Sequence, residues 1–245
     1  AYEIASCLVG SEMCIGDRCF YMAFDGITIA AMVKELHLNL DGGRFNKIAQ
    51  PEADELLITG KGTNGQCRLL LSASASLPLI YFTSKNKPSP MTAPNFCMLL
   101  RKHIGSARVS DIRQPGMERV VMFELEHLNE LGDPCKKVLI MELMGKHSNI
   151  IFCDDKGMIL DSIKHVSSHM SSVREVLPGR EYFIPKTQDK LDPLTVSEEE
   201  FCDVVCRKPC NVSRAVYSSL TGISPVVAEE ICFCLLYTSP SPRDK

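Results

Sequence analysis

The spacing of hydrophobic residues divides the first part of the chain into one helix and several strands. A helical period predicts a helix over residues 28–40, which the following Asp-Gly-Gly turn ends. Alternation of apolar and polar residues then predicts strands over residues 44–50, 55–59, 66–73 and 79–84. The short turns between these strands favour antiparallel hairpins over crossover helices.

A second helix is predicted after the proline-rich loop 85–94. Asn95 suits the N-cap position, and Gly105 suits the left-handed conformation that often ends a helix. Further alternation predicts strands over residues 107–114, 119–126, 136–143, 148–153 and 158–165. This number of strands with two helices predicts an α+β domain built on an antiparallel β-sandwich or flattened barrel.

The pattern becomes helical again after a polar linker over residues 172–191. An acidic first turn at 197–200 and apolar periods at 212–220 and 225–233 predict helices, with Ser224 as an N-cap. The sequence SLTGISPVVAEEI resembles a helix-hairpin-helix, which often presents backbone amides to a phosphate. No lysine or arginine follows this hairpin, so a purely structural helical subdomain is an equal alternative. The predicted domains are 22–185 and 186–234.

The two ends do not continue the neighbouring pattern. Residues 1–21 and 235–245 resemble translated adapter sequence rather than protein. The first stretch contains Glu3 and Glu12 among broken apolar residues, unlike a signal peptide. We therefore expect a native start at Met22 and a truncation after Phe233.

Composition limits the classes of function. The 245-residue chain has a formal net charge of −3, so nucleic-acid binding needs a local basic patch. Its 12 cysteines are irregularly spaced, which favours buried thiols in a reducing cytoplasm over a disulfide framework. Cys202, Cys206 and Cys210 would form one stripe on a helix, but Pro209 interrupts it and no second pair completes a metal site. No apolar run approaches the ~20 residues that span a bilayer.

Catalytic patterns are missing from the sequence. The six histidines are scattered, and no nucleophile elbow, HExxH or phosphate-loop motif accompanies them. We therefore expect neither an enzyme nor a bound cofactor or metal.

Basic residues gather near the predicted turns. Each group alone is usually a solvated surface, but several groups brought together would bind phosphates. The candidates for RNA phosphate contact are Arg44, Lys47, Arg101, Lys102, Lys146 and His147. Further basic pairs are Lys85 with Lys87 and Lys164 with His165. Because aromatic residues make up only 7% of the chain, we expect recognition of backbone and shape rather than extensive base stacking.

Several separate motifs resemble the N-terminal domain of the NFACT family. They are MLLRKHI at 98–104, NELGD at 129–133, MGKHSNII at 144–151, DSIKHVS at 161–167 and VLPGREY at 176–182. MAFDG at 22–26 resembles the start of the family's sequences. The resemblance runs in order over residues 22–233.

The resemblance implies a fold similar to the N-terminal domain of formamidopyrimidine-DNA glycosylases. Those enzymes use an N-terminal proline as nucleophile, and a chain that begins at Met22 has none. The family also implies tRNA contacts at Glu118, Arg119 and, less directly, Asp25. Arg119 can grip a phosphate or a base edge, whereas Glu118 stands where the family has aspartate. Without the resemblance, the simpler interpretation of Glu118 and Arg119 is a surface ion pair.

The resemblance further implies a non-catalytic, cytoplasmic factor of ribosome-associated quality control. Such a factor binds the large ribosomal subunit and its rRNA, and positions alanine tRNA for C-terminal tailing of stalled chains. The family's coiled-coil and C-terminal RNA-binding domains are missing here. The alternative is an adhesin that binds fibronectin, the older label of the family, which would require export. A DNA-processing enzyme is a third class, but it lacks the nucleophile.

Overall fold

The computed structural model describes residues 24–128, 132–185 and 189–238. The extension predicted over residues 1–21 lies outside the described residues, as do Met22, residues 239–245 and the first part of the NELGD motif.

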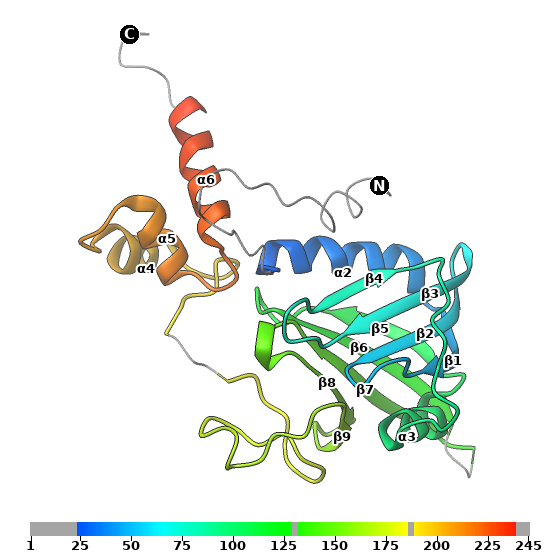
Figure 1. The fold of residues 1–245 in the computed structure, drawn as a ribbon. Coiled ribbons are helices and arrows are strands. Elements are labelled where there is room, and N and C mark those ends of the chain that lie inside the picture. The colour runs from blue at the N-terminus through cyan, green and yellow to red at the C-terminus, as the bar shows by residue number, and fades with distance from the viewer. Residues whose placement is uncertain (1–23, 129–131, 186–188, 239–245) are drawn as a thin grey trace.

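One antiparallel sheet of nine strands forms the body of the protein (Figure 1). The strand order is β4-β3-β2-β1-β5-β6-β7-β8-β9, and neighbouring strands in sequence pair as hairpins except across the β4–β5 step. The strands are β1 Arg44–Ala49, β2 Glu55–Gly62, β3 Gly65–Ser72, β4 Leu79–Phe82, β5 Arg108–Arg113, β6 Val120–Leu128, β7 Pro134–Glu142, β8 Asn149–Asp154 and β9 Ile159–Ser162. The predicted α+β class with antiparallel strands is therefore confirmed.

The strand pairing between β1 and β5 is the shortest in the sheet. These strands pair only at Arg44 and Arg108, so the sheet can bend there and bring its two arms together over one core. The rings of Phe45 and Phe123, one from each arm, lie 6.4 Å apart. The Lys164 ammonium, which follows β9, also donates to the Ala73 carbonyl, which follows β3.

Two helices cover this core, α2 Gly26–Leu40 and α3 Asn95–Ile104. The predicted cap of α3 is wrong: Pro94 occupies the N-cap, and Asn95 is already helical. Proline holds the extended conformation that starts the helix, and its carbonyl accepts from the Met98 amide at 3.0 Å. Gly105 has φ −61° and is not left-handed. Its lack of a side chain matters for space, because a Cβ there would lie 2.5 Å from the Arg101 carbonyl oxygen.

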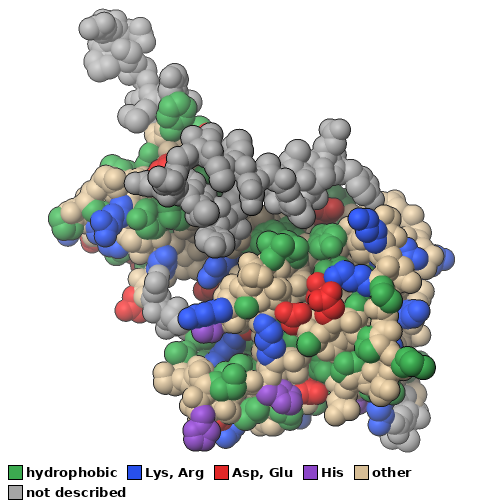
Figure 2. All heavy atoms as spheres, viewed as in Figure 1, with side chains coloured by type: hydrophobic (Ala, Val, Ile, Leu, Met, Phe, Trp, Pro, Cys, Tyr) green, Lys and Arg blue, Asp and Glu red, His purple; other side chains and the backbone are tan. Residues whose placement is uncertain are grey.

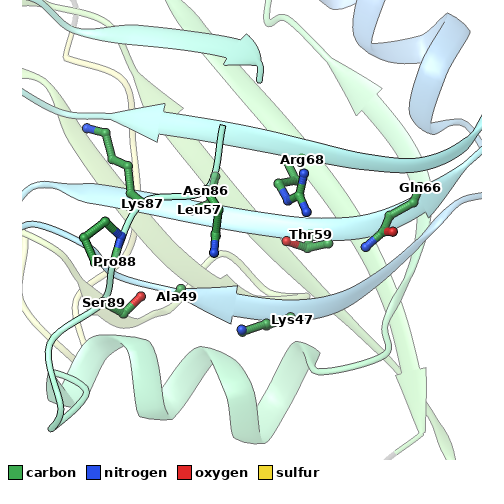
Figure 3. Close-up of a pocket in the computed structure, with 10 residues that line it drawn as sticks. All are labelled: Lys47, Ala49, Leu57, Thr59, Gln66, Arg68, Asn86, Lys87, Pro88 and Ser89. Atoms are coloured by element: carbon green, nitrogen blue, oxygen red, sulfur yellow. The ribbon is translucent and has the colours of Figure 1, made fainter. Parts of the chain in front are cut away.

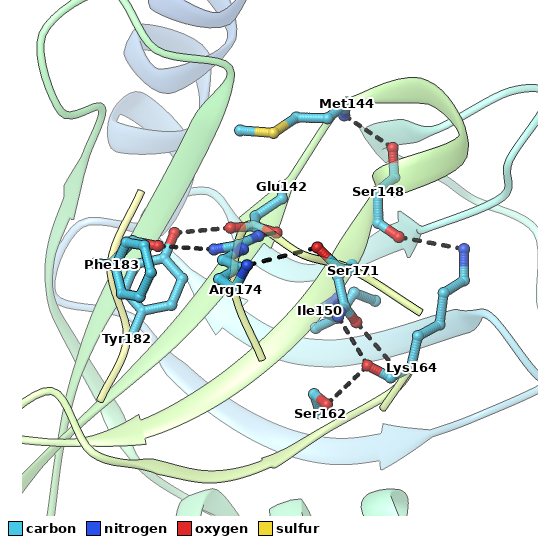
Figure 4. A network of polar contacts seen from close by, with 11 residues as sticks. Glu142, Met144, Ser148, Ile150, Ser162, Lys164, Ser171, Arg174, Tyr182 and Phe183 are labelled. Atoms are coloured by element: carbon cyan, nitrogen blue, oxygen red, sulfur yellow. Dashed lines mark hydrogen bonds and ion pairs between the residues drawn. The ribbon is translucent and has the colours of Figure 1, made fainter. Parts of the chain in front are cut away.

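A buried ion pair fixes the segment that follows β9 (Figure 4). Glu142 is fully buried and accepts from the Arg174 guanidinium at 2.5 Å and from the Tyr182 hydroxyl at 3.0 Å. Burial lowers the pKa of Arg174, but the hydrogen bond and charge of Glu142 outweigh it and leave this pKa raised. The pair therefore anchors residues 174–182 to the end of β7.

The helical unit has a small core of its own. Its elements are α4 Glu198–Phe201, the π-helical turn η2 Cys202–Cys206, α5 Val212–Ser219 and α6 Pro225–Thr238. A capping box between Ser197 and Glu200 starts α4. The cysteine stripe is not formed, because the helix ends at Cys206 and Cys210 lies beyond it, with all three thiols exposed. No group of three metal-ligating side chains occurs among the described residues.

Candidate functional site

The N-terminus of α2 joins the sheet to the helical unit. Asp25 caps α2, because its Oδ1 accepts from the Thr28 amide and hydroxyl, both at 2.8 Å. Its Oδ2 accepts from the Ser224 hydroxyl at 2.7 Å, across 199 residues of sequence. Asp25 is buried, and hydrogen bonds within the chain engage both of its oxygens. Asp25 therefore holds the start of α2 against the turn 221–224.

Backbone packing beside this cap is very close. The Gly26 amide donates to the Gly222 carbonyl at 2.8 Å. A Cβ at Gly26 would lie 2.3 Å from the Met117 carbonyl oxygen, and one at Gly222 would lie 2.2 Å from the same atom. Two glycines thus allow the turn 221–224 to sit against the turn between β5 and β6.

Gln114 connects the start of α2 to the β5–β6 turn. Its side-chain amide donates to the carbonyls of Gly26 and Glu118, each at 2.9 Å. Gln114 therefore holds the start of α2, next to Asp25, against the turn that contains Glu118 and Arg119. We call this region, comprising Asp25, residues 114–119 and residues 221–224, the junction.

Glu118 and Arg119 are half-buried at the junction. Burial raises the pKa of Glu118, Arg119 and Lys190 lower it, and Asp192 raises it further; the net direction is upward. Across the described parts of the chain, no ion pair within 4 Å joins Glu118 to Arg119, and the Arg119 side chain makes no hydrogen bond. The predicted surface ion pair is therefore not formed. No described residue accepts a hydrogen bond from the Arg119 guanidinium, so its donors are available to a ligand.

Lys190 adds positive charge next to Arg119, and Lys208 lies next to Lys190. Burial lowers the pKa of Lys190, and the charges of Arg119 and Lys208 lower it further. Lys190 donates to the Tyr217 carbonyl at 2.9 Å, and Lys208 donates to the Ser218 hydroxyl at 3.1 Å. Sequence reasoning missed both lysines, because they follow Arg119 by many residues and no local pattern links them to it.

The predicted phosphate contacts divide into two groups. Lys146 and His147 lie in the 3-10 helix η1 Gly145–His147, directly after Leu143, whose amide bonds the Arg119 carbonyl at 2.9 Å. These two exposed residues therefore belong to the same end of the sheet as the junction.

The other predicted contacts lie around β1 and α3. Arg44 and Lys47 are exposed on β1, and Arg101 of α3 donates its Nε to the Ile48 carbonyl at 2.7 Å. Lys102 is exposed on α3. Figure 2 shows lysine and arginine side chains spread over this view and interleaved with acidic ones. The six residues therefore lie on three separate elements, β1, α3 and η1.

The junction holds one group that can bind an anion. The Arg119 guanidinium has no bonded side chain among the described residues, and Lys190 lies near it. A guanidinium and a lysine are groups that proteins use to bind phosphate. The fold is an α+β domain with an attached helical unit.

Comparison with known proteins agrees with this class. The model for the NFACT N-terminal and middle domains matches residues 25–242. The chain belongs to the NFACT family. Among curated relatives, the Rqc2 homolog RqcH of Bacillus subtilis is 38% identical over 212 residues, which cover 85% of this chain and 37% of the relative. The Rqc2 homolog RqcH of Streptococcus suis is 37% identical over 75% of this chain and 34% of the relative. The chain therefore spans about a third of the length of these relatives.

Solved structures share the fold. The N-terminal domain of fibronectin-binding protein PavA from Streptococcus pneumoniae superposes with a TM-score of 0.79 at 33% identity, over 87% of this chain and 80% of that one. The N-terminal part of the fibronectin/fibrinogen-binding protein from Streptococcus suis gives a TM-score of 0.80 at 33% identity, over 88% and 80%. Within the described residues, no helix is both long and apolar enough to cross a membrane.

Proposed function

We propose that this chain is the tRNA-binding part of a ribosome quality control factor. In this role it binds the large ribosomal subunit and its rRNA in the cytoplasm, and it holds tRNA at the junction. Alanine tRNA is the expected species, because the family resemblance implies alanine tailing of stalled chains. The relatives named Rqc2 homolog RqcH support the ribosomal role.

The observation that carries the proposal is the environment of Arg119. Its guanidinium has no hydrogen-bonded or ion-paired side chain among the described residues, and Lys190 lies close enough for the two charges to affect each other. Glu118 and Asp192 lie near these cations but make no ion pair with Arg119, so an anionic partner would occupy donors of Arg119 that the described residues leave unused. RNA phosphate supplies that partner.

Glu118 gives the site a second recognition group. A carboxylate repels phosphate, but it can accept hydrogen bonds from a base amine. Paired with the Arg119 fork, it would read a base edge while the lysines hold the backbone. Asp25 supports the arrangement through the Ser224 hydrogen bond, which fixes the helical unit beside the β5–β6 turn.

The protein's contribution in this proposal is positioning rather than chemistry. Peptide-bond formation during tailing belongs to the ribosome. The junction supplies groups that bind and orient tRNA, and the proposal assigns it no covalent step, metal or cofactor.

The test is tRNA binding by the full 245-residue chain at two salt concentrations. Arg119→Ala should weaken binding by about 5- to 100-fold, the cost of losing one base-edge or phosphate contact. It should also reduce the salt dependence of log K by about one unit if the contact is to phosphate.

The matched control is Arg180→Ala, which removes an exposed arginine that pairs with Glu175 outside the junction. The control should bind tRNA as the unmodified chain does. Equal affinities for Arg119→Ala and Arg180→Ala would remove the junction from the proposal.

Fibronectin binding is a second candidate function. Two solved structures with TM-scores near 0.8 are named for fibronectin binding, and this likeness is the observation that favours it. Immobilised fibronectin should capture the chain if this function is present. Capture that Arg119→Ala leaves unchanged, together with no tRNA binding by the unmodified chain, would favour the adhesin over the tRNA-binding factor.

A further inference from the structure

A polar groove, separate from the junction, lies on the outer face of β1, β2 and β3, away from the core (Figure 3). The segment that follows β4 forms one wall of the groove, whose volume is about 320 Å³. Its lining residues are Lys47, Ala49, Leu57, Thr59, Gln66, Arg68, Asn86, Lys87, Pro88 and Ser89.

Strand register sets the polar side chains of the groove in one row. Lys47 pairs with Thr59, and Thr59 pairs with Arg68, so all three project from the same face of the sheet. Neighbouring strands lie about 4.8 Å apart, which places the backbones of Lys47 and Arg68 roughly 10 Å from each other. Two cations at this spacing can contact one phosphate or two successive phosphates of a nucleic-acid strand.

An apolar row lies beside the polar row on the same face of the sheet. Ala49, Leu57 and Leu70 pair across the same strands, two residues further along, and all are buried. The polar groups of the groove are therefore bounded on one side by buried apolar side chains.

The acidic residues near the groove are already engaged. Lys87 binds Glu55 at 2.5 Å and Glu52 at 3.4 Å, and these contacts pin the wall segment to the start of β2. Hydrogen bonding to Glu55 raises the pKa of Lys87. Neither glutamate lines the groove.

Lys47 and Arg68 are available to bind an anionic ligand. Arg68 donates one Nη1 bond to the Ser84 carbonyl at 3.1 Å, which orients its guanidinium and leaves further donors. Lys47 makes no hydrogen bond or ion pair with the part of the chain that the structure describes. Gln66, Asn86 and Thr59 add neutral donors around these two cations.

The groove is built for phosphate rather than for a base. Among the described residues, no acidic and no aromatic side chain lines it. Base recognition in single strands relies on aromatic stacking, whereas backbone recognition relies on lysine, arginine and neutral donors. The next row on the same face, Arg44 paired with Lys61, continues the positive charge.

The groove and the junction share no residue. Residues of β1, β2, β3 and the segment after β4 line the groove, whereas the junction comprises Asp25, residues 114–119 and residues 221–224. A ligand in the groove therefore contacts a different set of residues from a ligand at the junction.

We propose that this groove binds backbone phosphates of RNA, through Lys47 and Arg68, as a second contact separate from the junction. The proposal rests on the proposed function in taking RNA as the partner. The contact is independent of RNA sequence, because the groove offers groups that bind only the phosphate backbone, and it adds a second set of RNA contacts to those of the junction.

The test measures binding of a short fluorescent RNA hairpin to the full chain at several salt concentrations. The double variant Lys47→Gln/Arg68→Gln should bind about tenfold more weakly, on the scale of one or two charge-assisted contacts. Its salt dependence should fall by about one to two units in the slope of log K against log salt. Lys156→Gln, which neutralises an exposed lysine in the β8–β9 turn, is the matched control and should change neither quantity.

Arg68→Lys separates charge from the hydrogen bond to Ser84. Arg68→Lys should keep most of the RNA affinity, because the cation remains. A loss as large as that of the double variant would mean that Arg68 acts by holding the segment after β4 through Ser84, and this result would overturn the phosphate site. A double variant that behaves like Lys156→Gln would overturn it as well.

Arg119→Ala run in parallel distinguishes the two sites. Weaker RNA binding by Arg119→Ala alone supports the junction and refutes the groove. Weaker RNA binding by the double variant alone supports the groove and refutes the junction.

Discussion

Substitution of Gly222 by alanine tests the packing that holds the helical unit against the sheet. Gly222 has φ +74°, in the left-handed region, where a Cβ costs about 1–2 kcal/mol. The new Cβ would also lie 2.2 Å from the Met117 carbonyl oxygen and 3.1 Å from the Gly26 Cα. Those atoms belong to backbone, so the contact is relieved only if the two units move apart.

The expected cost combines both terms. Overpacking of a tight contact adds about 1–3 kcal/mol, so Gly222→Ala should lower the free energy of unfolding by about 2–5 kcal/mol. For a chain of this size, such a change lowers Tm by roughly 5–15 °C. Urea unfolding followed by circular dichroism, together with a thermal melt, measures both quantities.

Gly179→Ala is the matched control. Gly179 has φ +80°, but nothing lies within 4 Å of the position its Cβ would take. It should therefore show the conformational cost alone, about 1–2 kcal/mol. If Gly222→Ala is no more destabilising than Gly179→Ala, the close packing of Gly26, Met117 and Gly222 does not stabilise the protein, and the account of the junction fails.

Two further predictions concern buried charge. Arg174→Met should destabilise the fold by about 3–5 kcal/mol in chemical unfolding, because it leaves the fully buried Glu142 without its partner; a loss below about 1 kcal/mol would contradict the anchoring role. Glu118→Gln should change stability with pH. Burial raises the folded-state pKa of Glu118 above its ordinary 4.5, so ionisation penalises the native state as pH rises through that raised value. The variant should match the unmodified chain below about pH 4 and become the more stable of the two toward pH 7, and a reversed trend in melts at the two pH values would refute this.

Local pattern predicted most of the secondary structure. Runs of apolar residues located the strands, because each strand buries residues against the main core and several strands, β8 above all, are buried on both faces. The incorrect predictions concern the two ends of α3, where backbone conformation and steric space determine which residue fits. Asn95 looked like a cap, but Pro94 already supplies the extended residue before the helix, and Gly105 is required by the nearby Arg101 carbonyl rather than by its own φ.

The candidate site was only partly predictable. Glu118 and Arg119 came from family resemblance, and their half-buried position beside the helical unit needed the structure. Lys190 lies next to Arg119, and Lys208 next to Lys190, through the docking of distant segments, which no local period encodes. The same limit applies to the groove, where strand register aligns Lys47 with Arg68 across β2.

The most direct test of the central claim is to locate bound tRNA on the protein. Alanine tRNA that carries 4-thiouridine in its anticodon arm can be crosslinked to the full chain with ultraviolet light, and the attached peptides identified by mass spectrometry. Crosslinks are expected within residues 114–119 and in η1 Gly145–His147. Crosslinks confined to α4 and η2, or none above those of a tRNA without thiouridine, would contradict it.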